Sequence, residues 1–372
     1  MSKSKNVALI FGASGISGWA VTKWALSYPS PTTFDRVIGL TNRPLPLAKS
    51  GLPNDPRLEL HSGLNLRAGL EEVMSLLQKK VPNLEEVSHV YYLAYSNATA
   101  YSVDVMAIKE INVAMTYNAV HAVDRLCENL KFVMLQTGTN GDEIFYYAQV
   151  DLIKEANVGK TWKWCEVRPD QIVGHVPMPT SMTYVEPLAL YLMLYRYVNG
   201  LGARVVFPGS YATYTHTYTS SSQDIIARSE LYLSIEKPDQ AHGEAFNIAD
   251  SANLESWTLV WPKMCEYFGL RAQGAAPDDK GWKDIDKWWV AHQDNYKMMC
   301  REYGLRAREI PDATWIFLAA GFTFLGRNRE MSLGKIRALG FSEEYPLAHG
   351  YFKVFERLVQ ERIIPEKEAL RE

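Results

Sequence analysis

Two adjacent tyrosines, Tyr146 and Tyr147, are the first residues of this sequence that could do chemistry. They lie in LQTGTNGDEIFYYAQVDLI, which starts at Leu135 and has the pattern of a buried strand, a turn and a helix. A tyrosine hydroxyl there could hydrogen-bond the negative oxygen that develops when a carbonyl compound is reduced. A lysine one turn later would lower the pKa of the tyrosine, but Val150 and Asp151 occupy those positions. One core aromatic beside one surface aromatic is the alternative.

A glycine-rich loop near the N-terminus is the second candidate. In VALIFGASGISGWAVTKWAL, Gly12, Gly15 and Gly18 follow an apolar strand and open a helix. Such glycines allow a tight turn, the approach of a pyrophosphate to the backbone and close packing of helix on strand. The N–H groups at the helix start favour phosphates, with Ser14 and Ile16 beside them. The loop predicts a dinucleotide-binding site rather than a structural turn.

The end of the next expected strand, in VIGLTNRPLP, indicates which dinucleotide is bound. No Asp or Glu stands there to accept the ribose hydroxyls of NAD, and Asn42 and Arg43 occupy these positions. A guanidinium can hold the 2′-phosphate of NADP through paired hydrogen bonds. A surface arginine that caps a loop is the alternative. We expect NADP(H) as the cofactor.

Further cofactor contacts follow from the order of the strands alone. The carboxyl ends of parallel strands share one edge of a sheet, where such ligands bind. Gly63 and Leu64 are therefore expected beside the adenine. The other predicted contacts lie at or near the ends of later strands: Leu93, Ala94, Tyr95, Thr137, Tyr146, Pro169 and Ile172.

Short apolar runs alternate with amphipathic helical runs through the first half of the chain. The expected strands cover residues 6–12, 36–41, 57–62, 87–94, 130–137 and 162–169. Repeated β-α units of this length predict an α/β fold with a Rossmann-type doubly wound parallel sheet. Helical patterns dominate after Pro169.

The domain organisation is expected to follow this change. Residues 1–175 should form the NADP-binding domain and residues 176–372 a mainly helical substrate-binding lid. A short strand pair, ARVVFPGS with GEAFNIAD, is expected within residues 203–250, with a strand of this region returning to the first domain. The two longest apolar stretches, residues 187–194 and 315–326, are too short to span a bilayer and predict buried helices.

Composition and charge narrow the function classes. The chain has 39 basic and 42 acidic residues without a basic stripe, which argues against a nucleic-acid partner. Four separated cysteines predict reduced core residues, and no cluster has metal-ligand spacing. The N-terminus lacks the pattern of a signal peptide. We expect a cytoplasmic protein that acts on a small molecule without membrane contact. Long helices such as residues 107–130 leave a homodimer open.

Several motifs together resemble one enzyme family. GASGISG, GLTNRP, SHVYYLAYS, NLKFVMLQTG, FYYAQVDLI, WCEVRPDQIVGHVP and GEAFNIAD occur in this order over nearly the whole chain. The order is similar to that of the progesterone 5β-reductase/iridoid synthase-like enzymes, atypical members of the extended short-chain dehydrogenase/reductase superfamily. The resemblance implies an NADPH-dependent reductase of activated C=C bonds in enones and enals.

The sequence departs from the family at the catalytic positions that the resemblance implies. Tyr146 matches the family's tyrosine, but Asn140 stands where the family has a lysine and Ile144 where it has an asparagine. The family's longer insert between these motifs is reduced to residues 141–143. Tyr146 and Asn140 are therefore the catalytic candidates in this part of the chain.

Three functions remain open from the sequence. The first is reduction of an α,β-unsaturated carbonyl, or a related C=C or C=N bond, in a medium-sized apolar substrate of specialised metabolism. There a tyrosine need only hydrogen-bond the enolate oxygen. The second is a non-redox or bifunctional isomerase or cyclase, in which Tyr146 polarises a carbonyl while the pocket folds the substrate. The third is a regulator that binds NADP without turning it over.

Other residues could contact the substrate. His216, in PGSYATYTHTYTSSSQD, titrates near neutral pH and could be a general acid or base, with an ordinary loop histidine as the alternative. Tyr147, Tyr184 and Tyr214 are the expected substrate contacts. Glu186 follows Tyr184 at a helix start and could instead stabilise the helix dipole.

Overall fold

The computed structural model divides the chain into two compact units. The residues that it describes are 6–96, 105–139, 145–178, 180, 182–366 and 369. Unit 1 comprises Met1–Asp170, Gln223–Ile248 and Ser332–Ser342, and unit 2 comprises Gln171–Ser222, Ala249–Met331 and Glu343–Glu372. Each unit is therefore assembled from three segments that are distant in sequence.

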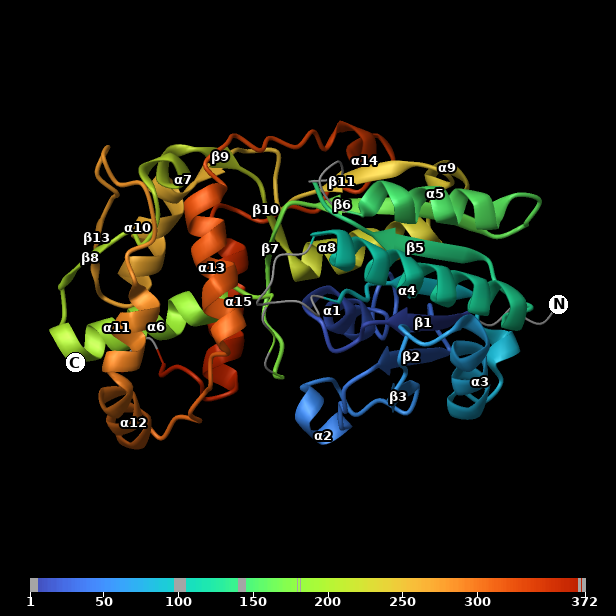
Figure 1. The fold of residues 1–372 in the computed structure, drawn as a ribbon, viewed down its shortest axis with the longest axis horizontal. Coiled ribbons are helices and arrows are strands. Elements are labelled where there is room, and N and C mark those ends of the chain that lie inside the picture. Colours follow the sequence, from blue (N-terminus) through green and yellow to red (C-terminus); the bar gives the residue numbers. More distant parts are fainter. Residues whose placement is uncertain are drawn as a thin grey trace. The chain divides into compact units, whose positions relative to one another are not determined.

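Unit 1 contains a seven-stranded parallel sheet in the order β11-β6-β5-β4-β1-β2-β3 (Figure 1). Its strands are β1 (Val7–Phe11), β2 (Arg36–Thr41), β3 (Leu58–Ser62), β4 (His89–Tyr92), β5 (Phe132–Gln136), β6 (Lys163–Pro169) and β11 (Ala245–Ile248). Every residue of β1 is buried, as expected for a strand that is covered on both faces. The arrangement confirms the predicted Rossmann-type sheet.

Helices accompany both faces of this sheet. They are α1 (Ile16–Trp24), α2 (Leu47–Ser50), α3 (Leu70–Lys80), η1 (Leu84–Glu86), α4 (Val105–Leu126), α5 (Tyr146–Asn157), α8 (Gln223–Ile235), α9 (Pro238–Ala241) and α14 (Gly334–Ala338). Val7, Leu9 and Phe11 share a buried cluster with residues of α3, α4 and α5. Because side chains alternate along a strand, Ala8 and Ile10 point to the opposite face. α1 packs against α8.

Unit 2 is mainly helical. Its helices are α6 (Val185–Asn199), α7 (Tyr211–Thr215), α10 (Trp257–Tyr267), α11 (Ile285–Ala291), α12 (Gln293–Glu302), α13 (Asp312–Phe324) and α15 (His349–Gln360). Its strands are β7 (Gln171–Val173), β8 (Arg204–Val206), β9 (Thr217–Tyr218), β10 (Ser220–Ser222), β12 (Glu255–Ser256) and β13 (Arg271–Gln273). They form three small sheets, β10 with β7, β12 with β9, and β13 with β8.

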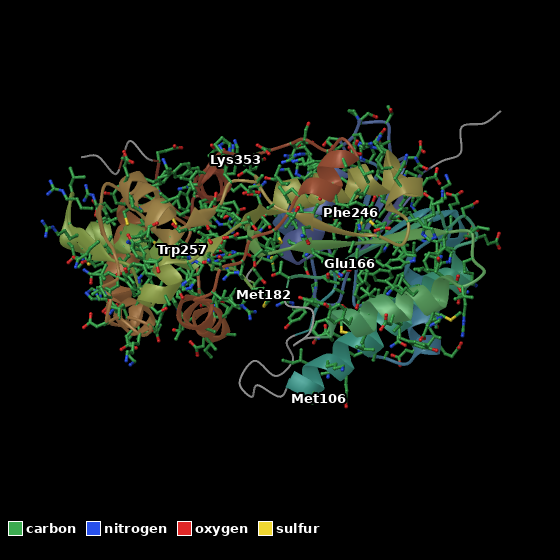
Figure 2. All side chains as sticks on the ribbon, turned by 90° about the horizontal axis from the view of Figure 1, so that it is seen from above. Met106, Glu166, Met182, Phe246, Trp257 and Lys353 are labelled. Atoms are coloured by element: carbon green, nitrogen blue, oxygen red, sulfur yellow. The ribbon has the colours of Figure 1, made fainter. Side chains whose placement is uncertain are left out.

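The predicted strand pair of residues 203–250 is wrong. β8 pairs with β13 in unit 2, whereas β11 pairs with β6 at the edge of the large sheet. Phe246 of β11 lies opposite Val167 of β6 and is 1% exposed (Figure 2). An apolar run indicates that a strand forms, but its partner depends on which distant segments the fold brings beside it.

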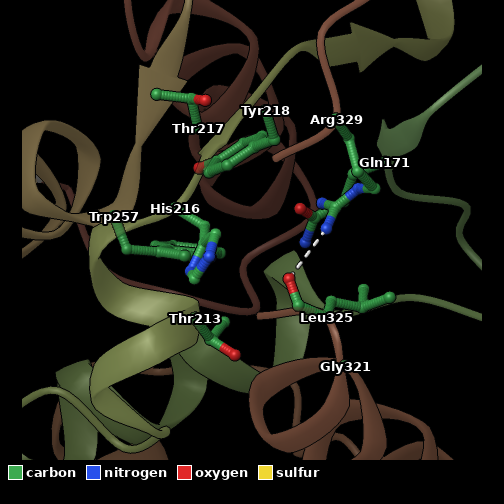
Figure 3. Close-up of a pocket in the computed structure, with 9 residues that line it drawn as sticks. All are labelled: Gln171, Thr213, His216, Thr217, Tyr218, Trp257, Gly321, Leu325 and Arg329. Atoms are coloured by element: carbon green, nitrogen blue, oxygen red, sulfur yellow. Dashed lines mark hydrogen bonds between the residues drawn. The ribbon is translucent and has the colours of Figure 1, made fainter. Parts of the chain in front are cut away.

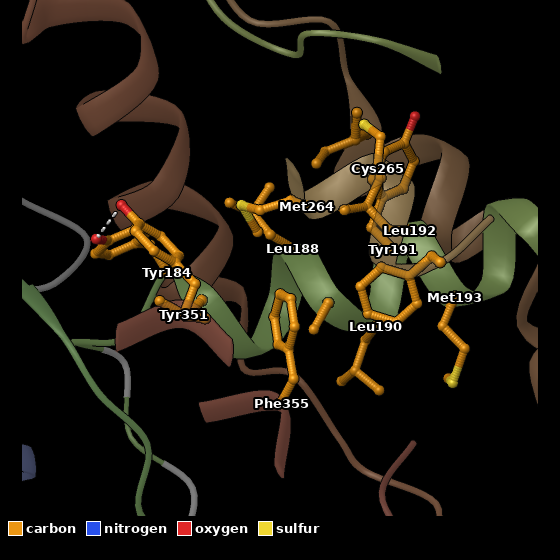
Figure 4. Packing of buried hydrophobic residues seen from close by; sticks show 14 of the residues in the cluster. Tyr184, Leu188, Leu190, Tyr191, Leu192, Met193, Met264, Cys265, Tyr351 and Phe355 are labelled. Carbon is orange, nitrogen blue, oxygen red and sulfur yellow. Dashed lines mark hydrogen bonds between the residues drawn. The ribbon is translucent and has the colours of Figure 1, made fainter. Parts of the chain in front are cut away.

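The two apolar helices differ in burial. All residues of α6 from Val185 to Leu194 are buried, which confirms the prediction for residues 187–194 (Figure 4). In α13, Leu318 and Phe322 are buried, but Ile316 is 49% exposed and Phe317 37% exposed. α13 is apolar around much of its circumference, so its sequence alone does not show which face is covered. In the part of the chain that the structure describes, no helix is both long and apolar enough to cross a membrane.

Candidate functional site

The glycine-rich loop of unit 1 joins β1 to α1. Gly15 is the N-cap of α1, and its backbone N–H donates to the Gly12 carbonyl at 2.9 Å. Gly12 has a φ of +86°, a left-handed conformation that other residues rarely adopt. No acidic side chain stands in the first turn of α1. The positive end of the helix dipole attracts a phosphate, and no carboxylate in the first turn of α1 would repel it.

Two of these glycines stand where a side chain would collide with backbone. A Cβ at Gly12 would lie 2.7 Å from the Leu93 carbonyl oxygen, and a Cβ at Gly18 would overlap the Gly12 carbonyl. A Cβ at Gly15 would meet only the Gly12 carbonyl oxygen, at 3.4 Å. Close packing thus explains why residues 12 and 18 are glycines. At Gly15 the backbone has space for the approach of a ligand. The loop fits the pyrophosphate of a dinucleotide.

Asn42 and Arg43 are exposed in the turn that follows β2. The Thr41 hydroxyl donates to the Arg43 carbonyl at 2.6 Å and lies 3.1 Å from the Ser62 hydroxyl, which fixes the backbone of this turn. The Arg43 side chain makes no ion pair with any residue that the structure describes. The turn therefore presents a guanidinium that has no counter-ion among the residues described in the structure.

The end of β3 lies beside this turn. Gly63 has a φ of +80°, and its N–H donates to the Asn42 carbonyl at 3.0 Å. The N–H of Leu64 donates to the Thr41 carbonyl at 3.0 Å. The structure thus brings the predicted adenosine contacts after β2 and β3 together at one edge of the sheet.

The end of β4 approaches the glycine-rich loop. The N–H of Leu93 donates to the Phe11 carbonyl at 3.1 Å. A Cβ at Gly12 would meet both Leu93 and Ala94, so these two predicted contacts lie against the loop. Tyr95 follows them and is 43% exposed.

Two side-chain hydrogen bonds that the sequence does not reveal fix the end of β5. The Thr137 hydroxyl donates to Glu166 Oε1 at 2.5 Å, and the Gln136 amide donates to the Ser17 hydroxyl of α1 at 2.9 Å. Glu166 is 3% exposed and also accepts from Arg168 at 2.6 Å. These contacts tie β5 to β6 and α1. The only signal for them in the sequence is that apolar strands end on polar residues.

Tyr146 begins α5 and lies against the backbone that follows β5. A Cβ at Gly138 would be 3.2 Å from Tyr146 Cε2 and 3.4 Å from its hydroxyl oxygen. The Tyr146 ring packs edge-on against Phe145 with centroids 5.0 Å apart, and Phe145 stacks on Tyr95 at 5.9 Å. The Tyr146 hydroxyl makes no hydrogen bond to any described residue. It can therefore bond a ligand.

Within the described residues, no cation lowers the pKa of this tyrosine. Burial, with a smaller contribution from Tyr95, raises the pKa of Tyr146 to about 12. Lys154, the nearest downstream lysine, is on the surface and pairs with Asp151 at 3.5 Å. The phenol of Tyr146 thus keeps its proton at neutral pH and serves as a hydrogen-bond donor.

The remaining predicted residues of this region differ in position and burial. Asn140 lies outside the described residues. Tyr147 follows Tyr146 on α5 and is 49% exposed. Pro169 is buried at the end of β6, and Ile172 belongs to β7 of unit 2. Among the residues that the structure describes, no group of His, Cys, Asp and Glu side chains could hold a metal ion.

His216 lines a small pocket within unit 2 (Figure 3). Its Nδ1 hydrogen-bonds the Ala212 carbonyl. Tyr184 and Tyr214 are not among the lining residues. The lining residues are Gln171, Thr213, His216, Thr217, Tyr218, Trp257, Gly321, Leu325 and Arg329.

Tyr184 and Tyr214, both predicted substrate contacts, lie in the packing of unit 2. Tyr184 is 4% exposed, and its hydroxyl lies 3.0 Å from the Tyr351 hydroxyl (Figure 4). Tyr214 packs on Phe207 with ring centroids 5.0 Å apart. Packing accounts for both rings, so their contact with a substrate stays a prediction.

Glu186 takes part in a buried ionic network rather than acting only on the dipole of α6. Its Oε2 lies 3.0 Å from His175 Nδ1, and its Oε1 accepts from Arg308 Nε at 2.5 Å. His175 Nε2 lies 3.1 Å from Glu361 Oε1. Burial alone would raise the pKa of Glu186, but His175 and Arg308 outweigh burial and lower it.

Comparison with known proteins places the chain in a family. The sequence model of the PRISE-like Rossmann-fold domain matches residues 8–142 and 139–365. The chain belongs to this family. The short chain dehydrogenase ausT of Aspergillus calidoustus is 52% identical over 400 residues, covering 100% of this chain and 97% of the relative. The 3-oxo-Delta(4,5)-steroid 5-beta-reductase of Arabidopsis thaliana is 27% identical over 296 residues, covering 73% and 71%. The PRISE-like chain is thus an enzyme of the short-chain dehydrogenase/reductase type, as the resemblance implies.

Solved structures support the same fold. The GDP-mannoheptose C4 reductase of Campylobacter jejuni, solved with NADP bound, has a TM-score of 0.58 at 12% identity, covering 96% of this chain and 99% of that one. At this identity the likeness concerns the fold, which is that of NAD(P)-binding Rossmann proteins.

The family match is interrupted at the place where the sequence lacks the expected insert. The two matched stretches of the PRISE-like chain meet at residues 139–142, between β5 and α5. The alignment with ausT spans 400 positions against 372 residues here, so about 28 positions of that alignment have no residue in this chain. The chain is therefore shorter than this relative, and the interruption of the family match includes residue 140, where the resemblance implies a lysine.

Proposed function

We propose that this PRISE-like enzyme is an NADPH-dependent reductase of α,β-unsaturated carbonyl compounds, in which Tyr146 hydrogen-bonds the oxygen of the developing enolate. The position of the Tyr146 hydroxyl carries the proposal. It lies beside Gly138 after β5, without a hydrogen-bond partner among the described residues, in the same unit as the glycine-rich loop. The name of the A. thaliana relative describes reduction of a C=C bond conjugated to a ketone, which supports this substrate class.

The chain's own residues suit this reaction without the lysine. The bound NADPH would supply a hydride. A phenol with a pKa of about 12 donates a hydrogen bond to an enolate oxygen and keeps its own proton. The hydride-transfer step of conjugate reduction needs only this donor, and the enolate then takes a proton at its α-carbon from water, whereas reduction of a ketone needs transfer of a proton to the alkoxide. The missing lysine therefore weakens ketone reduction more than reduction of an enone.

Arg43 supports NADPH over NADH. Its guanidinium has no protein counter-ion among the described residues and follows β2, where a ribose 2′-phosphate is expected. No carboxylate stands in the same turn to accept the 2′-hydroxyl of NAD.

Hydride transfer is tested with deuteride-labelled NADPH, a panel of enals, enones and cyclic imines, and mass spectrometry of the products. We expect deuterium at the β-carbon of an enone. Tyr146→Phe should lower the rate about 10²–10³-fold, because one oxyanion donor is lost. Tyr117→Phe, on the exposed side of α4, is the matched control. Undiminished turnover of Tyr146→Phe would refute the role of this tyrosine.

A non-redox isomerase or cyclase is the second candidate function. It is favoured by the absence of a lysine beside Tyr146 and by the interrupted family match at residues 139–142. On this alternative Tyr146 polarises a substrate carbonyl through its hydroxyl proton. Products with unchanged mass and no deuterium, formed by protein that binds NADPH tightly, would favour it over the reductase.

A further inference from the structure

Lys80, the last residue of α3, packs its side chain against the end of β3 in unit 1. A Cβ at Gly63 would lie 3.4 Å from Lys80 Nζ and 4.0 Å from its Cε. Because Gly63 has no side chain, the lysine takes up the space beside the backbone there. The N–H of Gly63 donates to the Asn42 carbonyl at 3.0 Å, which joins this place to the turn that carries Arg43. The ammonium of Lys80 thus lies at the edge where the adenosine of the cofactor is expected.

Acidic residues are absent from the two loops at this edge. Residues 41–52, after the body of β2, and residues 62–70, at the end of β3 and beyond it, contain no Asp or Glu. Glu71 and Glu72 stand in the first turn of α3, at the opposite end of that helix from Lys80. The two loops therefore offer an anion no carboxylate that would repel it.

The charge of Lys80 is not balanced within the described part of the chain. Its ammonium makes no hydrogen bond or ion pair with a described residue. Glu59, the acidic residue of β3, accepts from Arg36 Nε at 2.5 Å and lies 3.2 Å from His61 Nε2. The edge after β2 and β3 thus carries two cations, Arg43 and Lys80, that have no counter-ion among the described residues.

We propose that Lys80 is a second cation for the ribose 2′-phosphate of NADPH and that, together with Arg43, it determines the choice of dinucleotide. A phosphate monoester carries a charge of about −1.5 to −2 at pH 7, so one guanidinium balances it only in part. An arginine supplies a planar pair of donors, and a lysine supplies a compact charge with three rotatable N–H groups. The inference rests on the proposed function, because it assigns a further residue to the dinucleotide that would supply the hydride.

A structural role at the end of α3 is the alternative for Lys80. Lys79 and Lys80 both stand in the last turn of α3, where a cation interacts favourably with the negative end of the helix dipole. Lys79 is exposed, and its side chain does not come within 4 Å of a Cβ at Gly63. The two lysines thus share the helix, the turn and the charge, but only Lys80 reaches the end of β3. Lys79 is therefore a matched control.

NADP⁺ and NAD⁺ differ only in the 2′-phosphate and therefore test the proposal. Affinities are measured by calorimetry on the full-length protein, with NAD⁺ measured by competition against NADP⁺. Lys80→Gln should weaken NADP⁺ about tenfold and leave NAD⁺ unchanged, because a charge-assisted hydrogen bond to the phosphate is lost. Lys80→Arg should keep most of the affinity, and Lys79→Gln should keep all of it.

Two further measurements distinguish a contact with the phosphate from a structural role. The difference between wild type and Lys80→Gln should shrink in about 1 M sodium chloride, because salt screens charges that solvent reaches. The double variant with Arg43→Gln should no longer prefer NADP⁺ over NAD⁺. An equal loss of affinity for both dinucleotides, no loss for either, or the same loss in Lys79→Gln would overturn the proposal.

Transfer of deuteride from labelled NADPH separates this proposal from the proposed function. Selective, Lys80-dependent binding of NADP⁺ without deuterium in any product would leave the phosphate contact standing and remove the reductase. Deuterium in a product, together with an NADP⁺ affinity that Lys80→Gln does not change, would leave the reductase standing and remove this role of Lys80.

Discussion

The phenol of Tyr146 keeps its proton because it is buried beside Gly138, and the described residues provide no cation to stabilise its anion. Removing a charge from water disfavours the ionised form of any acid. A neutral phenol can still donate a hydrogen bond, so the same burial that slows proton transfer is compatible with holding an enolate oxygen. The surroundings of Tyr146 thus set its pKa, and the pKa favours donation of a hydrogen bond over transfer of the proton.

Arg43 should determine the choice of dinucleotide. Arg43→Gln is expected to weaken NADPH binding about 10–100-fold and to leave NADH binding unchanged, since hydrogen bonds to a charged group contribute about 1.5–3 kcal/mol. Fluorescence titration of both cofactors measures the change, with the exposed Arg301→Gln as control. An equal loss for NADPH and NADH would argue against a contact with the 2′-phosphate.

Glu230 should destabilise the folded chain at neutral pH. The side chain on α8 is fully buried, and neither carboxyl oxygen has a hydrogen-bond partner in the described part of the chain. Burial raises the pKa of Glu230 well above the usual range. Glu230→Met is expected to stabilise by about 1–3 kcal/mol, because an unsatisfied buried polar group is removed.

The pH dependence of that gain has a definite sign. A raised folded pKa means that the wild type is most stable below the unfolded value of about 4.3 and loses stability as pH rises toward the folded pKa. The advantage of Glu230→Met in thermal unfolding should therefore grow from pH 4 to pH 8. The exposed Glu236→Met on the segment after α8 is the control. A variant that is less stable than wild type throughout would show that Glu230 has a favourable partner.

At the scale of elements, His175 links parts of unit 2 that no local sequence pattern connects. Through Glu186 and Glu361 it joins the segment after β7 to the start of α6 and to the residue that follows α15. Arg308 adds the segment before α13 by donating to Glu186 and to the Val176 carbonyl at 3.0 Å. A buried network of this kind holds segments in register only while its charges are balanced.

His175 should make the stability of unit 2 depend on pH. Burial alone would lower the pKa of His175, but Glu186 and Glu361 outweigh burial and raise it above the ordinary 6.5. The contribution of its charge is therefore complete below about pH 6.5 and is lost as pH rises through the folded pKa. His175→Gln should lower stability by about 2 kcal/mol at pH 6 and by less at pH 9.

Thermal unfolding of both proteins across this range measures the effect. His349→Gln, a half-buried histidine of the same unit, is the control. A difference between wild type and His175→Gln that does not change with pH would mean that His175 is neutral in the folded protein.

At the scale of the whole molecule, the family match is interrupted between β5 and α5 and not within either element. Both elements are present, and Tyr146 still begins α5. The glycine-rich loop and the ends of β2, β3 and β4 keep the geometry that suits a dinucleotide. Cofactor binding and catalytic rate should therefore respond separately to changes at residues 140–144.

A double variant tests this separation. Asn140→Lys with Ile144→Asn, the residues that the family resemblance implies, should raise the rate of enone and ketone reduction by about 10²-fold or more, at unchanged NADPH affinity, if a missing oxyanion helper limits the chain. Asn140→Lys alone shows how much of the gain belongs to the lysine. No gain in either protein, measured by NADPH oxidation, would indicate a site rebuilt for another reaction.

The sequence by itself predicted six of the seven strands of the large sheet and the glycine-rich loop, and the cofactor contacts at the strand ends stay predictions. These features are encoded locally: apolar runs of four to seven residues form strands, and Gly12 must adopt a positive φ beside Leu93. The tyrosine and the absent lysine were equally visible, because their spacing on one helix is a local property.

Only the tertiary structure decided which distant segments meet. It paired β11 with β6 instead of β8, joined Thr137 to Glu166, and gathered Gln171, His216 and Arg329 around one pocket. No periodicity in the chain encodes such contacts, because their partners are selected by packing of the whole unit. The tertiary structure also decides the pKa of Tyr146, because other parts of the fold bury this side chain.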